Sequence, residues 1–155
     1  MMRRILAMVG LLFATLLLQG CPKGVAINVF NNSNERLSVL VQNHEQLEWG
    51  TGTSLNFRSG ERGLKVARDV RGHIVPLLMV KKGEKQLSYQ LSFYGLPEEY
   101  VGHSSGNAFT SGTLEYKLQL EPDGNLYVVK PGSSLPASEI EQPPGFPIRP
   151  DSQIR

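Results

Sequence analysis

Cysteine is nearly absent from this sequence: Cys21 is the single cysteine among 155 residues. A lone cysteine cannot form an internal disulfide, so the chain is not a disulfide-stapled scaffold and Cys21 needs another explanation. Histidine is also scarce, and His44, His73 and His103 stand about 30 residues apart, without the close spacing of a zinc site. We therefore expect no metal and no cofactor.

The chain also carries no large excess of positive or negative charge. The chain has 16 basic and 14 acidic residues, and Arg3 and Arg4 are two of the basic ones. Without residues 1–20 the two classes balance at 14 each. A neutral chain of this kind has no basic patch for nucleic acid, so we expect no nucleic-acid partner.

The sequence also lacks an apolar run long enough for a transmembrane helix. Its longest run extends from Ile5 to Leu18, which is 14 residues, whereas about 20 are needed to span a bilayer. Arg3 and Arg4 precede this run and the small residue Gly20 follows it. Together these are the three parts of a secretory signal peptide, predicted here over residues 1–20.

The end of this segment carries a more specific motif. Leu18-Gln19-Gly20-Cys21 resembles the lipobox of bacterial lipoproteins, with a small residue directly before the cysteine. The resemblance implies that the Cys21 thiol carries a diacylglycerol and that its new α-amine is acylated. Pro22 stands where an aspartate would favour the inner membrane, so the resemblance implies a lipid anchor in the outer membrane, facing the periplasm. Residues 21–24 are then a lipidated N-terminus with a short tether.

Residues 25–130 are expected to form one domain built from β-strands. Leu87, Tyr89, Leu91 and Phe93 alternate with polar residues, and residues 113–121 alternate in the same way. This period of two is typical of half-buried strands. Asp123-Gly124 between two apolar runs predicts a hairpin turn. The remaining strands are expected at Val25–Phe30, Arg36–Val41, Gln46–Trp49, Leu55–Phe57, Gly63–Arg68, His73–Val80 and Leu126–Lys130.

Short strands at even spacing, without a long amphipathic helix, predict an all-β fold. We expect an antiparallel β-sandwich of about 100 residues, the size of an immunoglobulin or transthyretin domain, with a small β-barrel as the alternative. Pro76 lies inside one apolar run and indicates an edge strand or a bulge there.

Proline accumulates at the C-terminal end of the chain. Six prolines lie within residues 131–155, and proline favours extended polyproline II over helix or central strand. We expect this segment to be a flexible tail, because chain termini are loose unless they are tied down. The alternative is an ordered strap along the domain, for which Ile140, Phe146 and Ile148 supply apolar side chains.

No set of residues predicts catalysis. Gly102-His103-Ser104-Ser105-Gly106 fits the G-x-S-x-G pattern of hydrolases, but that fold needs a histidine after the serine and a strand before it, and both are missing. We interpret the motif as a glycine- and serine-rich loop. Glu98-Glu99 after Pro97 is typical of the first turn of a short helix, with proline at its first position. We therefore expect a protein that is not an enzyme.

The segment from Tyr94 to Gly112 is the best candidate for a binding surface. It is a long connection between two strands, and such connections are often functional. Tyr94, Tyr100, His103 and Phe109 lie in it, and tyrosine offers a large, stiff contact area. The alternative is that these aromatic side chains fold inward and cap the sandwich. Trp49, before a glycine turn, is a further candidate, with packing in the core as its alternative.

These observations predict a small outer-membrane lipoprotein that acts as a non-catalytic, protein-binding accessory subunit of an envelope assembly. In size and layout it resembles the small sandwich lipoproteins that dock secretion machinery on the outer membrane. One alternative is a periplasmic inhibitor or immunity protein against a toxin or lytic enzyme, which predicts a protruding loop. Another is a carrier of a small apolar ligand, which requires a sizeable apolar cavity.

Overall fold

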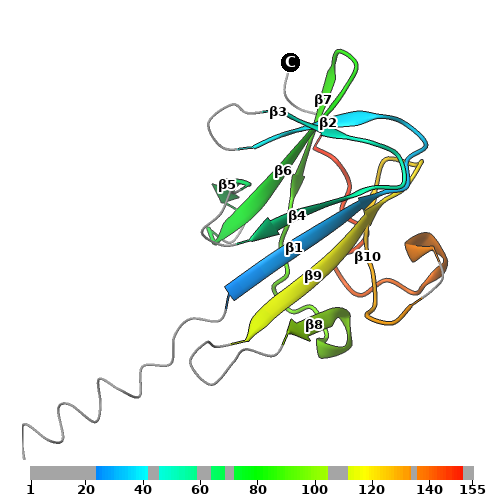
Figure 1. Ribbon diagram of the computed structural model, residues 1–155. Helices are drawn as coiled ribbons and strands as arrows, with labels where there is room; N and C mark the ends of the chain where they lie inside the picture. Colours follow the sequence, from blue (N-terminus) through cyan, green and yellow to red (C-terminus); the bar gives the residue numbers. More distant parts are fainter. Residues whose placement is uncertain are drawn as a thin grey trace, which may run out of the picture.

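The computed structural model describes residues 24–41, 46–58, 64–68, 72–104, 112–133 and 136–151. The lipidation motif ending at Cys21 and the candidate Phe109 lie outside these residues. The described chain is all β, with ten strands and two 3-10 helices of three residues each (Figure 1). None of its helices is long and apolar enough to cross a membrane.

The first sheet has the order β4-β1-β9-β10. β1 runs parallel to β9, with Gly24 opposite Thr113 and Asn31 opposite Leu120. Because β1 occupies one edge of β9 along its whole length, β8 and β10 share the other edge. The strands are β1 (Gly24–Asn31), β4 (Ser54–Arg58), β8 (Val101–Ser104), β9 (Thr113–Leu120) and β10 (Leu126–Val128).

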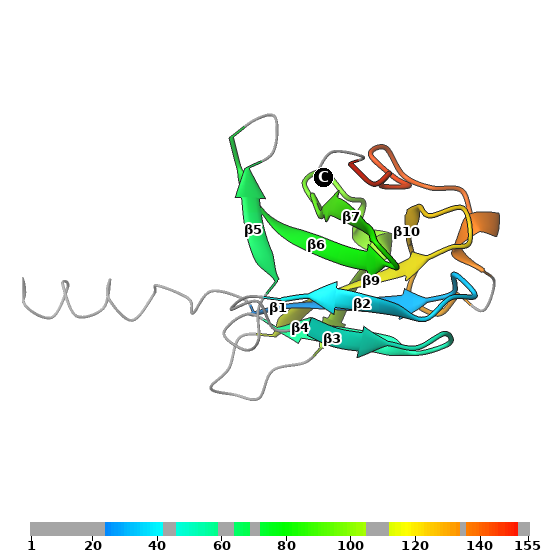
Figure 2. The ribbon, with the colours of Figure 1, turned by 90° about the horizontal axis from the view of Figure 1, so that it is seen from above.

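The second sheet is entirely antiparallel and is centred on β6. β7 pairs with one edge of β6, while β2 and β5 follow each other along its opposite edge. Seen from above, β5 projects away from the other strands of this sheet (Figure 2). The strands are β2 (Leu37–Leu40), β3 (Gln46–Trp49), β5 (Lys65–Arg68), β6 (Ile74–Lys82) and β7 (Lys85–Gln90).

The expectation of an edge strand or a bulge at Pro76 is wrong. Pro76 lies in β6, opposite Val66 of β5, and β6 has neighbours on both edges. The backbone carbonyl of Pro76 accepts a hydrogen bond from the Leu91 N–H at 2.8 Å, just beyond the last residue of β7. The missing N–H of proline therefore falls where the β6–β7 ladder ends, so no internal ladder bond is lost.

The two sheets pack face to face, which confirms the β-sandwich; the described strands do not close into a barrel. The expected alternation is visible in the core, where Tyr89 and Leu91 are fully buried and Leu118 and Leu120 are nearly so. The hairpin at Asp123-Gly124 is also confirmed by the antiparallel pairing of β9 with β10. The departure from an all-antiparallel arrangement is the parallel pair β1 and β9.

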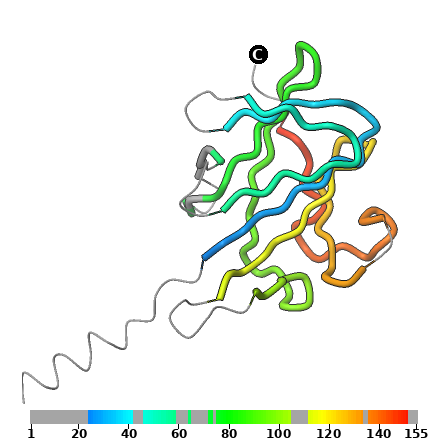
Figure 3. Tube along the Cα trace, viewed as in Figure 1, coloured from blue at the N-terminus to red at the C-terminus, as the bar shows by residue number. Residues whose placement is uncertain are grey.

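Residues 136–151, named the strap here, lie along the domain and do not form the expected tail. The tube in Figure 3 shows this segment returning across the strands. Ile148 exchanges two backbone hydrogen bonds with Leu126 of β10, at 2.8 and 2.9 Å. The Asp151 N–H then donates to the Ser88 carbonyl of β7 at 2.8 Å. The strap therefore joins an edge of the first sheet to an edge of the second.

Side-chain contacts explain why a proline-rich segment is ordered here. The side-chain amide of Gln142 accepts a hydrogen bond from the Val128 N–H and donates one to the Val128 carbonyl, as a neighbouring strand would. Ala137 is fully buried, and Phe146 and Ile148 pack against the core. These apolar contacts offset the conformational entropy that an ordered terminus loses.

Candidate functional site

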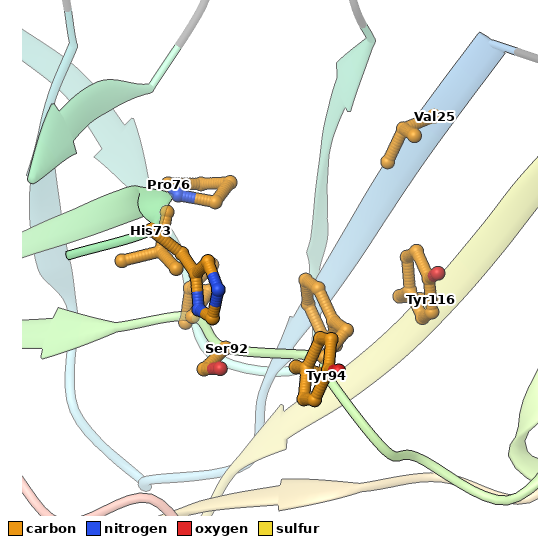
Figure 4. A pocket seen from close by; sticks show the side chains of 9 residues that line it. Val25, His73, Pro76, Ser92, Tyr94 and Tyr116 are labelled. Atoms are coloured by element: carbon orange, nitrogen blue, oxygen red, sulfur yellow. The ribbon is translucent and has the colours of Figure 1, made fainter. Parts of the chain in front are cut away.

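An apolar hollow of about 470 Å³ opens at the end of the sandwich where β1 begins (Figure 4). The first sheet contributes Val25 of β1 and Tyr116 of β9 to its walls. The second sheet contributes Val75 and Pro76 of β6, and residues 91–94 after β7 complete the lining. The hollow thus lies where the two layers part, and segments far apart in the sequence build it.

One wall of the hollow is a stack of aromatic rings. Phe93 and Tyr116 lie face to face, with ring centroids 4.0 Å apart and an interplanar angle of 10°. Phe146 of the strap lies 6.5 Å from Phe93, at an interplanar angle of 26°. Contacts of this kind fix ring positions beyond what area burial alone does. The strap therefore helps to set the shape of the hollow from behind.

The rim carries a second aromatic pair. Tyr94 and His73 stack with ring centroids 5.4 Å apart and an interplanar angle of 20°. Tyr94 is 75% exposed and is the one large hydrophobic side chain classed as exposed among the described residues. Figure 4 shows the Tyr94 ring at the mouth, between His73 and Tyr116. An exposed aromatic ring beside an apolar depression is a typical anchor for a binding partner.

The lining of the hollow is mostly apolar. The residues that line the hollow include no aspartate, glutamate, lysine or arginine. A tyrosine phenol is already uncharged at neutral pH, and burial raises the pKa of the Tyr116 hydroxyl further. A site of this composition suits an uncharged apolar or aromatic group, since a charge would be desolvated there without compensation.

Two of the predicted site residues are core residues instead. Trp49 is fully buried, and its indole N–H donates to the Thr53 carbonyl at 3.1 Å. Tyr100 is 7% exposed, and its hydroxyl donates to the Glu141 carbonyl of the strap at 2.7 Å. Trp49 thus offers no contact area to a partner and Tyr100 offers little, because most of the area of these rings is already removed from water.

The other candidates fall in different places. Tyr94 lies on the rim of the hollow, as described above. His103 is exposed on β8, opposite Leu114 of β9, and does not line the hollow. Of the five candidates, the structure therefore brings Tyr94 alone to the hollow, with Phe109 outside the described residues.

The connection from Tyr94 to Gly112 contains more structure than expected. Glu98–Tyr100 form a 3-10 helix, and Pro97 is its N-cap rather than its first residue. Val101–Ser104 form β8, so the first three residues of the G-x-S-x-G motif lie in a strand and not in a loop. A Cβ atom at Gly102 would lie 3.2 Å from the Cβ of Glu115. This glycine therefore permits the close approach of β8 to β9.

The sequence patterns did not predict that most of the residues lining the hollow lie close together. Val25, His73 and Tyr116 belong to three strands or strand ends whose pairing cannot be read from local periodicity. The alternation that places Phe93 on the core face was visible, and its packing beside Tyr116 follows from that face. In the described part of the chain, no group of three His, Cys, Asp or Glu side chains could hold a metal ion.

Comparison of the chain with protein-family models, curated proteins and solved structures finds no match.

Proposed function

We propose that this protein is a lipid-anchored, non-catalytic binding subunit of an assembly in the bacterial cell envelope. Cys21 holds it at the outer membrane, facing the periplasm, and the apolar hollow binds a protein partner. The observation that carries the proposal is Tyr94, 75% exposed on the rim of a neutral, apolar hollow.

The physical argument rests on the shape and rigidity of the hollow. Protein interfaces concentrate their binding energy in a few aromatic anchors that meet pockets on the partner. Here the ring stack of Phe93, Tyr116 and Phe146 orders the site before a partner arrives, so little conformational entropy is lost on binding. A volume of about 470 Å³ accommodates one or two apolar side chains of a partner.

A carrier of a small apolar ligand is the second candidate. The hollow falls within the range of roughly 300–1,000 Å³ that ligand pockets occupy. It is open to solvent, however, whereas the space between the sheets is filled by buried side chains such as Trp49, Tyr89 and Leu78. A carrier encloses most of its ligand, so the open hollow favours a protein partner.

Crosslinking of the lipidated protein in intact cells tests the proposal. A photo-crosslinking phenylalanine analogue replaces Tyr94, and the matched control carries the same analogue at Glu84 in the β6–β7 turn, far along both strands from the hollow. A third sample carries Cys21→Ala and is unanchored. The expected result is one abundant protein adduct from position 94, none from position 84, and loss of that adduct in Cys21→Ala.

Other outcomes discriminate the alternatives. A soluble toxin or lytic enzyme that crosslinks equally well to Cys21→Ala would support an inhibitor. Absence of any protein adduct, combined with co-purification of a small apolar molecule, would support a carrier. Either result overturns the proposed accessory subunit.

A further inference from the structure

The distance between the hollow and the proposed lipid anchor is limited by the covalent chain. Three peptide units join Cys21 to Gly24, and a fully extended chain spans at most about 3.6 Å per residue. The first residue of β1 thus lies within about 11 Å of the Cys21 Cα atom. Val25, which lines the hollow, is one residue further. One wall of the hollow is therefore held close to the membrane that carries the anchor.

The chemistry of the hollow favours a protein segment over the bilayer itself as its occupant. Surfaces that bind bilayers usually combine several inserted apolar groups with lysine and arginine for the anionic headgroups. The lining of the hollow has no lysine or arginine, and Tyr94 is the one exposed large hydrophobic side chain among the described residues. A concave site with fixed aromatic walls fits a side chain better than a flat lipid surface.

The short tether also restricts where that side chain can come from. A folded domain of 100 residues has a radius of gyration of about 13 Å, so its full width exceeds the reach of the tether. Where the hollow faces the membrane, a soluble partner of that size has little room between the two. A chain that is already embedded in the membrane enters this space without such a restriction.

From these constraints we infer that the hollow binds an apolar or aromatic segment of a membrane-embedded protein, next to the point where that protein leaves the same bilayer. This inference rests on the proposed function, because it requires both the lipid on Cys21 and a protein partner. It adds the class of the partner and the part of the partner that is recognised. Tyr94 and the wall formed by Phe93 and Tyr116 make the contact.

The test combines the photo-crosslinking analogue at position 94 with a longer tether in the full-length lipidated protein. About 20 glycine and serine residues, inserted between Lys23 and Gly24, have a root-mean-square span of about 25 Å. They leave β1 intact, because β1 begins at Gly24. The adduct is then assayed for retention in membranes washed with alkaline carbonate.

The expected result is a protein adduct that stays in the washed membranes and whose yield falls at least about fivefold with the longer tether, because the effective concentration falls. An adduct with a protein that the wash removes, or with phospholipid, would overturn the inference. So would a yield that does not depend on tether length.

Failure of the inference can be told apart from failure of the proposed function. If a general amine-reactive crosslinker captures an envelope complex but position 94 yields no adduct, the inference is overturned and the accessory role stands. If neither method captures a protein, both are overturned. The same analogue at position 84 is crosslinked in parallel. An adduct found at position 94 and absent at position 84 is specific to the hollow.

Discussion

At the Asn31 end of β1 the sandwich is closed by buried polar side chains, whereas at the Gly24 end it opens onto the apolar hollow. Asn31 is fully buried, and its amide donates to the carbonyls of Glu35, Trp49 and Gly50 at 2.9–3.2 Å. Glu121, 4% exposed, accepts a hydrogen bond from the Asn32 amide at 2.7 Å. The hollow, in contrast, leaves Tyr94 mostly in water.

The two ends of β1 therefore differ in role: the Asn31 end contributes to stability, whereas the Gly24 end offers surface for binding. The buried Asn31 amide at the closed end is fully hydrogen-bonded, as buried polar groups generally are, whereas the buried Oε1 of Glu121 has no hydrogen-bond partner. The open end keeps apolar area exposed, which stabilises nothing until a partner covers it. We therefore expect substitutions at the closed end to change the free energy of unfolding and substitutions on the rim of the hollow to change binding.

Asn31→Ala should have the largest effect. It leaves three buried or partly buried carbonyls without their amide donor and removes the acceptor of the Ser33 N–H and hydroxyl. We expect unfolding to become easier by about 3 kcal/mol. Denaturant unfolding followed by Trp49 fluorescence measures it. Asn28→Ala, which removes an exposed side-chain pair with Asn56, is the control, and an equal loss there would contradict the comparison.

Phe146→Ala tests the strap, which supports the hollow from behind. Removal of a partly buried ring that stacks on Phe93 should cost about 2 kcal/mol and loosen the aromatic wall. The variant should therefore lose both stability and crosslinking at position 94. Glu141→Ala, an exposed side chain in the same segment, should stay within about 0.5 kcal/mol of the parent. Unchanged stability of Phe146→Ala would show that the Phe146 ring does not support the hollow.

Tyr89→Phe tests how alkaline pH lowers the stability of the domain through the Tyr89 hydroxyl, which reaches the β9–β10 turn. The Tyr89 hydroxyl donates to the Gly124 carbonyl at 2.8 Å, so its loss should cost about 1 kcal/mol at neutral pH. Burial, and secondarily the negative charge of Asp123, raise the pKa of Tyr89. The unfolded phenol ionises near pH 10, so the stability of the parent is complete below about pH 10 and falls as pH rises above it.

Unfolding midpoints measured between neutral pH and about pH 11 check this sign. Tyr89→Phe should lose less stability over that interval than the parent does. Tyr94→Phe, which removes an exposed hydroxyl, should keep the alkaline loss of the parent. The same alkaline loss in Tyr89→Phe as in the parent would assign it to other groups.

Tyr94→Ala should have the smallest effect on stability and a large one on binding. Its exposed ring contributes little to the core, so the free energy of unfolding should change by less than about 0.5 kcal/mol. Binding to the captured partner should weaken at least about tenfold, as expected for a tyrosine anchor. Titration of the purified partner measures this, with Glu84→Ala as the control. Unchanged binding would remove the hollow from the interface.

Local sequence patterns predicted the strands well because they depend on neighbouring residues. The expected strand Gln46–Trp49 coincides with β3, and the Asp123-Gly124 turn joins β9 to β10. β8 was not expected, since Val101–Ser104 is short and contains a glycine. The burial of Trp49 was left open by the sequence, because the strand that covers it lies elsewhere in the chain.

The candidate site was predicted only through Tyr94: Trp49, Tyr100 and His103 do not line the hollow, and Phe109 lies outside the described residues. No local pattern could bring Val25, His73 and Tyr116 together, because their proximity depends on which strands pair and on how the two layers part. The strap was offered as an alternative to a tail. Proline content alone does not distinguish an ordered strap from a flexible tail. The strap is ordered because Gln142 bonds to Val128 of β10 and Phe146 stacks on Phe93.

The sequence by itself determined most of the strand segments, the turn residues and the near balance of basic and acidic residues, since each follows from side-chain alternation, backbone freedom and composition. The tertiary structure decided the closed end, the strap and the hollow. All three depend on contacts between residues far apart in the chain, such as Asn31 with Trp49, Ile148 with Leu126 and Phe93 with Tyr116. Such contacts exist only after the two sheets have packed, because packing then brings these distant segments within contact distance.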